Sequence, residues 1–296
     1  MKVLNFGSMN IDNVYNVDHI IAPGETENST GIAHHCGGKG LNQSIALAKA
    51  GAPVWHAGQI GDDGKMLLDI LSESGVHTDF IRKIQGHSGH TIIQVDKNGQ
   101  NSIILFGGAN RSMTRDFIDD VLSHFERDDV LLLQNEINEL PYIIDKAAER
   151  GLRIFFNPSP YDELIASCDL SKIYMFFINE VEGAQITGKN DPDEILSEMK
   201  KLYPNASVLL TLGGNGSVCQ TADETCHQNI FKVTPVDTTA AGDTYTGFFI
   251  AAYLEGKTLK EAMTLASKAS AIAVTREGAA PSIPTRKEVD ESTITE

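Results

Sequence analysis

The chain has few cysteines, little basic charge and no long apolar segment. Its 296 residues include 4 cysteines, none of which belongs to a Cys-x-x-Cys pair. This scatter argues against a disulfide framework or a zinc site and favours reduced thiols in a cytosolic protein. The longest apolar stretches, such as residues 248–254, are far shorter than the ~20 residues that cross a bilayer. Asn5, Ser8 and Asn10 interrupt the apolar core that a signal peptide would need, so we expect a soluble, cytoplasmic protein.

Basic residues are outnumbered: 24 Lys and Arg stand against 40 Asp and Glu, which gives a formal net charge of −16. Nucleic acids and anionic membranes require clustered Lys and Arg, so the composition argues against both as partners. An anionic small molecule is still compatible, because backbone amides and one metal ion can hold it locally. The length suits one large α/β domain or two small ones. No linker divides the chain, so we expect a single domain over residues 1–296.

Strand-like and helix-like segments alternate along most of the chain. The expected strands cover residues 2–6, 54–60, 130–134, 153–157, 174–178 and 207–212, and the expected helices cover residues 41–50, 65–74, 141–150 and 192–201. Strands separated by helices of about ten residues form crossover units, which make the strands parallel and cover both faces of the sheet. The sequence thus predicts an α/β fold with a mainly parallel sheet.

Two segments without helices interrupt this alternation. Residues 91–106 contain two alternating runs around Asn98-Gly99, a strong hairpin signal, and residues 13–36 are strand-like and polar. We expect them to form a small sheet that stands off the main one, over about 13–36 and 89–106. Such a sheet could serve as a lid or as a dimer contact, and its exposed edges favour a homodimer.

Residues 237–244 have the composition of an anion site. They follow a strand-like piece, residues 231–236, and open a helix over residues 245–254. Small residues at 240–242 allow a tight turn whose N–H groups point outward, and a helix start adds roughly half a positive charge. Asp243 is placed there to take a proton from an attacking hydroxyl. The alternative is that Asp243 only caps the helix, since Asp is a favoured N-cap residue.

Two glycine-rich loops offer further ligand contacts. Residues 36–43 lead into a helix but fail the dinucleotide-binding fingerprint, because the third glycine position holds Gln43. Lys39 and Asn42 supply directed polar groups in the same loop, which a tight turn with positive φ would not by itself require. Residues 211–216 end a strand and form a flexible loop, for which a hairpin turn is the alternative.

Other apparent motifs indicate no function. Residues 256–258 resemble the end of a P-loop, but Ala251 occupies the earlier glycine position and the segment follows a helix. The histidines at 34, 35, 87 and 90 lack a third and fourth metal ligand at a fitting spacing, which favours solvated loop histidines.

The motifs together resemble the ribokinase family of sugar kinases, the PfkB group, over nearly the whole chain. The first glycine block and the block at 237–243 correspond to the two signatures of this family, in the right order and about 200 residues apart. The other similar segments are 7–12, 23–26, 107–110, 179–182, 211–213, 236–247 and 271–284. The resemblance implies a ribokinase-like three-layer sandwich with a mainly parallel central sheet and a small protruding β-sheet lid.

The resemblance also implies a role for each matching residue. Asp243 would be the catalytic base, and the anion hole for the γ-phosphate would consist of Ala240, Ala241 and Gly242. The sugar hydroxyls would be held by Asn10, Asp12, Gly38, Lys39, Asn42 and Glu136, with Asp243 beside them. The residues near ATP would be Asn179, Glu182, Thr211, Gly213, Gly216, Gly242 and Ser267.

Two cations are implied in the same way. Glu182 would lie near the hydration shell of Mg²⁺. A monovalent cation, usually K⁺, would sit beside the anion hole. Its ligands, several of them through backbone carbonyls, would be Asp237, Thr239, Ala273, Arg276, Gly278 and Ser282.

The implied activity is ATP-dependent phosphorylation of the primary hydroxyl of a small sugar, with ribose to ribose 5-phosphate as the leading hypothesis. Two departures bear on the ligands: Ser267 stands where His or Asn is usual beside the nucleotide, and residues 90–94 of the lid are unusually polar. A ketose, a deoxy-sugar acid or a nucleoside is therefore an alternative substrate. A non-catalytic sugar-sensing module is an alternative of another class, against which the intact Asp243, Asn179 and Glu182 argue.

Overall fold

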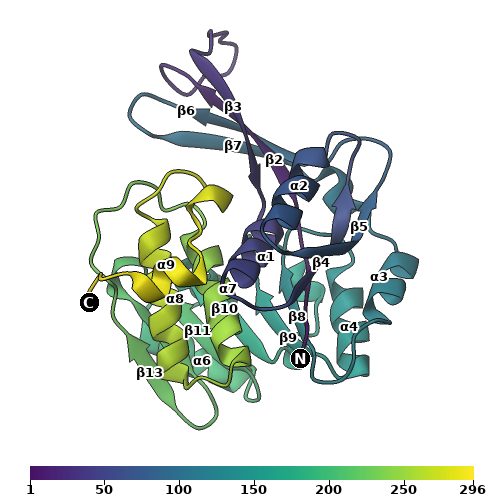
Figure 1. Cartoon of the computed structure of the whole chain (residues 1–296), viewed down its shortest axis with the longest axis vertical. Coiled ribbons are helices and arrows are strands. Elements are labelled where there is room, and N and C mark those ends of the chain that lie inside the picture. The colour runs from purple at the N-terminus through teal and green to yellow at the C-terminus, as the bar shows by residue number, and fades with distance from the viewer.

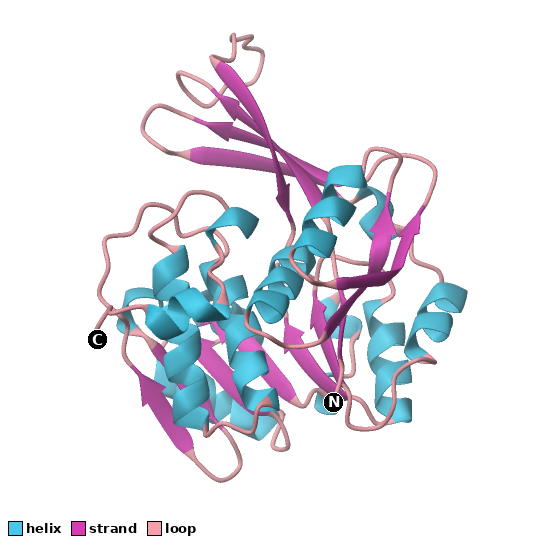
Figure 2. Ribbon diagram, in the orientation of Figure 1, coloured by secondary structure: helices cyan, strands magenta, loops and turns pink.

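The computed structural model describes all 296 residues and consists of a large sheet, helices on both of its faces and a separate small sheet (Figure 1 and Figure 2). The large sheet is 9-stranded, in the order β13-β12-β11-β10-β9-β8-β1-β4-β5. Its strands pair in parallel except at one edge, where β11, β12 and β13 pair antiparallel. The strand bounds are β1 Val3–Phe6, β4 Val54–Ile60, β5 His77–Lys83, β8 Val130–Gln134, β9 Arg153–Asn157, β10 Met175–Asn179, β11 Ser207–Thr211, β12 Ser217–Gln220 and β13 Thr225–Gln228.

Helices cover both faces of this sheet, which explains why its central strands are apolar on both sides. Successive residues of β1 point to opposite faces, so that Val3 belongs to one buried cluster and Leu4 to the other. The first face is covered by α1 Lys39–Lys49, α2 Lys65–Glu73, α7 Ala241–Leu254, α8 Leu259–Ala273 and α9 Arg286–Glu291. The second is covered by α3 Arg115–Leu122, α4 Leu140–Arg150, α5 Glu180–Thr187 and α6 Pro192–Leu202. The predicted three-layer arrangement is confirmed.

The small sheet, which we call the lid, projects from the body at the top of Figure 1. It comprises β2 Asn10–Asn16, β3 Gly31–Gly37, β6 Gly89–Val95 and β7 Asn101–Phe106, in the order β3-β2-β6-β7. The strands β2 and β6 pair in parallel and so join two antiparallel hairpins. The small sheet expected over 13–36 and 89–106 is therefore present, and each outer strand leaves an unpaired edge.

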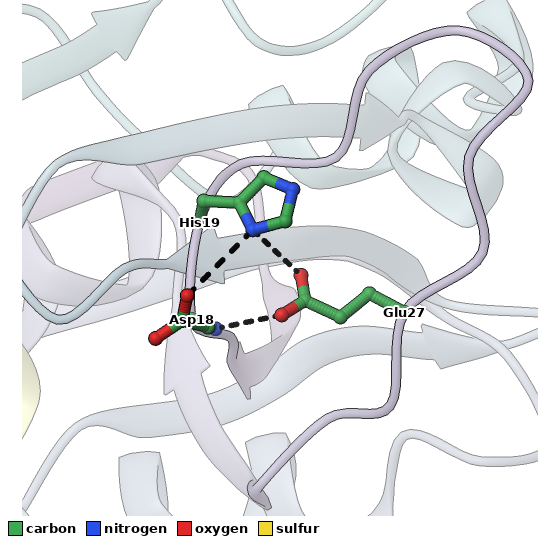
Figure 3. Close-up of side chains that lie close together, drawn as sticks. All are labelled: Asp18, His19 and Glu27. Carbon is green, nitrogen blue, oxygen red and sulfur yellow. Dashed lines mark hydrogen bonds and ion pairs between the residues drawn. The ribbon is translucent and has the colours of Figure 1, made fainter.

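The loop between β2 and β3 is held by a cluster of charged groups around His19 (Figure 3). His19 Nε2 lies 2.8 Å from Glu25 Oε1, while His19 Nδ1 lies 3.6 Å from Glu27 Oε2 and 3.9 Å from Asp18 Oδ2. Lys97, in the loop between β6 and β7, places its Nζ 3.0 Å from Asp18 Oδ1. The cluster thus links the two hairpins at the far end of the lid.

The prediction of a strand over residues 231–236 is wrong. Strand β13 is the last of the sheet, and the chain after it runs irregularly past the sheet edge. Its apolar residues Phe231, Val233 and Pro235 line a cavity instead of pairing with a strand. The helix expected from residue 245 begins earlier, at Ala241. None of the helices combines the length and apolar character that a membrane span requires.

Candidate active site

Asp243 is the third residue of α7, at the end of that helix nearest the carboxyl edge of the sheet. The N-cap position belongs to Ala240, whose φ of 59° turns the chain into the helix. The alternative that Asp243 is merely the N-cap of α7 is therefore wrong. The backbone N–H groups of Gly242 and Asp243 have no backbone acceptor. Two donors and the positive end of the helix dipole thus remain for an anion.

Two amide side chains of α1 hold the Asp243 carboxylate. Asn42 Nδ2 donates to Asp243 Oδ2 at 3.1 Å, and Gln43 Nε2 donates to Asp243 Oδ1 at 2.8 Å. Asp243 is 8% exposed, so its charge lies largely out of water. The Oδ1 of Asn42 is buried without a hydrogen-bond partner, and buried polar atoms rarely stay unsatisfied. It is a ready acceptor for a ligand hydroxyl beside the carboxylate.

The glycines before α1 let this helix approach the connection between β1 and β2. Gly38 has a φ of +94°, and a side chain there would press on the backbone of Ser8 and Asn10. A side chain on Gly40 would overlap with the backbone of Gly7. The glycines are thus required for a tight loop. The same close approach places the first turn of α1 beside the start of β2.

Lys39, the first residue of α1, lies among three carboxylates. Its backbone N–H donates to Glu136 Oε2 at 2.9 Å, and Ser8 Oγ donates to the same oxygen. Burial alone would lower the pKa of Lys39, but the carboxylates of Asp243, Glu136 and Glu182 hold that pKa above its usual value. Burial in turn raises the pKa of Glu136 despite its hydrogen bonds. The Lys39 ammonium therefore stays charged at neutral pH and can neutralise an anionic ligand.

The start of β2 presents the other predicted sugar ligands. Asn10 Oδ1 accepts a hydrogen bond from Asn110 Nδ2 at 2.7 Å, and Asp12 Oδ1 accepts one from Thr91 Oγ1 at 2.6 Å. A side chain on Gly37, opposite Asn10 in strand β3, would overlap with the Asp12 carboxylate. Burial raises the pKa of Asp12, although the Thr91 hydrogen bond acts in the opposite direction. Both side chains are therefore held in place by neighbouring elements.

The predicted nucleotide residues line two adjoining cavities. The smaller has a volume of about 240 Å³, and its lining includes Lys39, Asn157, Asn179, Glu182, Thr211 and Asp243. The larger has a volume of about 410 Å³, and its lining includes Thr211, Gly213, Gly216, Phe231, Ser267 and Val274. The two cavities share Thr211, Thr238, Ala241 and Gly242. They meet at the first turn of α7, with the polar cavity on the side of Asp243 and the more apolar one beyond it.

Asn179 and Glu182 form a capping box at the start of α5. Glu182 N donates to Asn179 Oδ1 at 3.0 Å, and Asn179 N donates to Glu182 Oε2 at 2.9 Å. The box fixes the buried Glu182 carboxylate at the wall of the smaller cavity. It uses one carboxylate oxygen and leaves the other, Oε1, for a ligand. Carboxylate oxygen is the donor that Mg²⁺ prefers, directly or through water.

Asp237 ties the loop before α7 to the segment after α8. Its Oδ1 accepts from Thr239 N at 2.8 Å and from Thr239 Oγ1 at 2.6 Å, and its Oδ2 accepts from Gly278 N at 2.9 Å. Burial would raise the pKa of Asp237, but these hydrogen bonds hold it below its usual value. The Arg276 guanidinium pairs with Glu288 at 2.7 Å, which leaves only its carbonyl for a cation. Oxygen is the ligand that hard cations take, and these segments would offer K⁺ a carboxylate and backbone carbonyl oxygens.

The other predicted ligands lie near these segments. Ser267 faces the larger cavity, and its Oγ donates to the Asn229 carbonyl at 3.2 Å. Ala273 is the buried last residue of α8. Ser282 is fully buried, and its Oγ donates to the Ala279 carbonyl at 2.7 Å.

The motifs rejected as functional are structural features. Gly256 adopts a φ of +74° in the turn between α7 and α8. His34 Nδ1 hydrogen-bonds to Asn13 Oδ1 at 2.8 Å, and His87 Nδ1 lies 3.2 Å from Asp63 Oδ2.

Sequence reasoning missed three site residues, namely Gln43, Thr91 and Asn157. Gln43 directly contacts Asp243, Thr91 contacts Asp12, and Asn157 lines the smaller cavity. A usable signal existed for Asn157, because a polar residue that ends an apolar parallel strand lies at the ligand-binding edge. No signal marked Thr91, whose partner belongs to a distant strand.

The comparisons with known proteins agree with this geometry. A mainly parallel three-layer α/β body, a β-lid and an acid beside a free helix start define the class of protein. Residues 1–286 match the pfkB family carbohydrate kinase pattern. The chain belongs to the pfkB family of carbohydrate kinases, which confirms the resemblance read from the sequence.

Relatives named ribokinase match the chain over almost its whole length, and one of the similar proteins is about twice as long. The chain is 34% identical to the ribokinase of Haemophilus influenzae, over 95% of either protein. It is 36% identical to the bifunctional ribokinase/ribose-5-phosphate isomerase A of Fructilactobacillus sanfranciscensis, over 97% of this chain but only 55% of that longer protein. The structure of Arabidopsis thaliana ribokinase complexed with ribose and ATP superimposes with a TM-score of 0.88, at 30% identity, over 98% of this chain and 97% of the other.

Proposed function

We propose that this protein transfers the γ-phosphoryl group of ATP to the primary hydroxyl of ribose, forming ribose 5-phosphate and ADP. The observation that carries the proposal is the Asp243 carboxylate, held by two amides beside the unpaired N–H groups that begin α7. The relatives named ribokinase, one of them solved with ribose and ATP, support ribose as the acceptor.

Asp243 acts as general base in this proposal. It takes the proton of the primary hydroxyl, and the electron pair of that oxygen forms the new bond to the γ-phosphorus. The bond from the γ-phosphorus to the bridging oxygen breaks, and ADP leaves with the electron pair. The N–H groups of Gly242 and Asp243 and the start of α7 stabilise the charge that gathers on the phosphoryl oxygens. Ala240 and Ala241 shape this anion hole without side chains that would fill it.

In this proposal the sugar is oriented by groups from three segments near Asp243. Asn10 and Asp12 would bind it from β2, and Gly38, Lys39 and Asn42 would bind it from the start of α1. Glu136, which follows β8, completes the set and accepts the backbone N–H of Lys39. Several fixed acceptors suit a polyol, because each hydroxyl can donate one hydrogen bond.

ATP fits the two adjoining cavities. The larger, with Phe231 and Val274 on its walls, suits the adenosine, and the smaller, with Lys39 and the start of α7, suits the phosphates. Bound Mg²⁺ would supply charge neutralisation between the phosphates, and Glu182 would hold its hydration shell. K⁺ would be held by the oxygen atoms around Asp237. The bound K⁺ would keep the loop before α7 in place.

The lid closes over the sugar and excludes water, which would otherwise accept the phosphoryl group. We further propose that two copies of the chain associate through their lids. Ile32, Ile92, Ile104 and Phe106 share one face of the lid by strand register and are all exposed. Contiguous exposed apolar residues favour such an interface. A cytoplasmic location follows from the need for ATP.

A substrate panel tests the proposed function. Purified protein with ATP, Mg²⁺ and K⁺ would be offered ribose, 2-deoxyribose, fructose and a nucleoside, with ADP release and product mass measured for each. We expect the highest kcat/KM with ribose and a product heavier by one phosphoryl group. A higher kcat/KM with another acceptor would overturn ribose, and the absence of any phosphorylated product would overturn the kinase activity.

A further inference from the structure

A chain of buried amide side chains extends from Asp243 into the central sheet. Gln43, on α1, donates to Asp243 Oδ1 at 2.8 Å and to Asn157 Oδ1 at 3.2 Å. Its own Oε1 accepts from Gln134 Nε2 at 2.6 Å. Gln134 Nε2 also donates to Asn5 Oδ1 at 3.1 Å. All of the hydrogen-bonding groups of the Gln43 amide are therefore occupied, and the amide has one orientation.

Chemistry dictates which way the Gln43 amide points. A carboxylate accepts hydrogen bonds and cannot donate them, so the Gln43 atom that faces Asp243 is the nitrogen. The Gln43 oxygen must then face a donor, and Gln134 supplies it from the end of β8. A reversed Gln43 amide would set its oxygen against the Asp243 carboxylate and its NH₂ against the NH₂ of Gln134. Gln134 thus fixes Gln43, and Gln43 in turn fixes Asp243.

The inner end of the chain is equally well fixed. Asn5, in the middle of β1, donates to Gly40 O and to Ser44 Oγ, both at 2.8 Å. Ser44 Oγ in turn lies 2.8 Å from the ring nitrogen Nδ1 of the buried His56. Asn5 and His56 are buried polar residues of β1 and β4, and their burial costs desolvation free energy that their hydrogen bonds offset. In the same network the Oε1 of Gln134 is buried without a hydrogen-bond partner. Such a network specifies a single arrangement of α1 over the sheet.

Gln43 does not face the ligands. It is 0% exposed and Gln134 is 1% exposed, and neither residue lines either of the two cavities. Asn42 differs, because it has an unpartnered oxygen beside Asp243. Asn42 also lines neither cavity, but its oxygen is a free acceptor, whereas both N–H groups of the Gln43 amide and its oxygen already have partners.

We propose that Gln43, oriented by Gln134, is a positioning residue that sets the angle and the lone pair with which Asp243 meets the sugar hydroxyl. The inference rests on the proposed function of Asp243 as base. Gln43 touches neither sugar nor nucleotide and acts only through the carboxylate. Its contribution therefore belongs to the transition state, and its loss lowers kcat with little change in KM.

The test begins with Gln43→Met, which preserves length and removes the hydrogen bonds. A hydrogen bond to a charged group corresponds to roughly a 10- to 100-fold effect, so we expect kcat to fall by about that factor, with the KM values for ribose and ATP within about threefold. The matched control is Gln59→Met in β4, a buried glutamine whose Oε1 has no partner and which lines neither cavity. Its kcat should stay within about twofold.

A double-mutant cycle separates positioning from folding. Gln134→Met leaves the Gln43 amide free to reverse, so kcat should fall although residue 134 does not contact Asp243. In the Gln43→Met background the same change should cause no further loss, because the path to Asp243 is already broken. Independent, multiplicative losses, or a raised KM with unchanged kcat, would overturn the inference.

Two further measurements distinguish failure of the positioning role from failure of the proposed function. Ribose binding by calorimetry shows whether each variant is folded, and Gln134→Met provides the test if Gln43→Met does not fold. Activity that survives in Asp243→Asn would refute the proposed function itself. Activity lost in Asp243→Asn but retained in Gln43→Met would refute only the positioning role.

Discussion

Gly38 shows how a single backbone position shapes the site. Its φ of +94° lies where only glycine is unstrained, and a side chain would press on the backbone of Ser8 and Asn10. Gly38→Ala should therefore destabilise the fold by roughly 1–3 kcal/mol and raise the KM for the sugar, because Asn10 is displaced. Urea unfolding and steady-state kinetics measure the two effects.

Gly86→Ala is the matched control for this substitution. Gly86 also has a positive φ, +109°, but a side chain there would meet nothing within 4 Å. It should show the backbone strain without the rise in KM. If Gly38→Ala left the KM for the sugar unchanged, the close approach of α1 to β2 would not be what positions the sugar-binding residues.

At the residue scale, the sequence revealed the reactive side chains better than the residues that hold them in place. Asp243 and Lys39 stood out because a charged side chain beside small residues and a helix start has few structural explanations. Gln43 did not, since its partners Gln134 and Asn157 lie about a hundred residues away and only the fold brings them together. Hydrogen bonds of such long range leave no local pattern.

At the scale of elements, the His19 cluster gives the lid a pH dependence. The hydrogen bond to Glu25, with the charges of Glu25 and Glu27, raises the pKa of His19 above its usual value. Because the pKa of His19 is higher in the folded loop, protonation of His19 stabilises the loop. This stabilisation is complete at pH values below the unfolded-state pKa of about 6.5, and it is lost as the pH rises through the folded-state pKa. Hydrogen exchange in residues 17–30 should therefore quicken with pH across this window, beyond the intrinsic change.

The change His19→Gln isolates this effect. The variant should show no such pH-dependent protection, and in the parent protein NMR should give a His19 pKa above the usual value. The ion pair of Lys97 with Asp18 is present in both proteins, so it does not affect the comparison. A His19 titration at or below the usual pKa would contradict the cluster's role.

The cation prediction concerns the loop before α7 and the segment after α8. If K⁺ is held around Asp237, then exchanging Na⁺ for K⁺ should raise kcat in the parent protein, because the loop before the anion hole becomes ordered. Asp237→Asn should remove most of that difference. Rates that are equal in the two salts would refute the cation site and leave the phosphoryl transfer proposal intact.

Elements were predictable in proportion to how regular their patterns are. The apolar strands of the central sheet and the helices α1, α2, α4 and α6 were placed within two residues. The expected strand at 231–236 failed because its apolar residues face a cavity, and apolar content alone does not distinguish a sheet partner from a pocket wall. The short strands β12 and β13, the last two on one side of the sheet, have too little apolar character to stand out.

At the scale of the whole molecule, the lid predicts association. Ile104 is 61% exposed on the apolar face of the lid, and pairing of two lids would bury it. Light scattering should give a mass near twice 32.1 kDa, and Ile104→Lys should shift the population toward the monomer. Leu202→Lys, on α6 and also exposed, should leave the mass unchanged. A monomeric mass for the parent protein at every concentration would contradict the dimer.

The central claim is that Asp243 removes the proton of the accepting hydroxyl. The most direct measurement is single-turnover phosphorylation of ribose by Asp243→Asn, an isosteric change that keeps the shape of the site, with binding of ribose and ATP measured in parallel. The account predicts both ligands bound and a rate constant lower by at least ~10²-fold, the lower end for a positioned acid–base group. A rate constant equal to that of the parent protein, with both ligands bound, would contradict it.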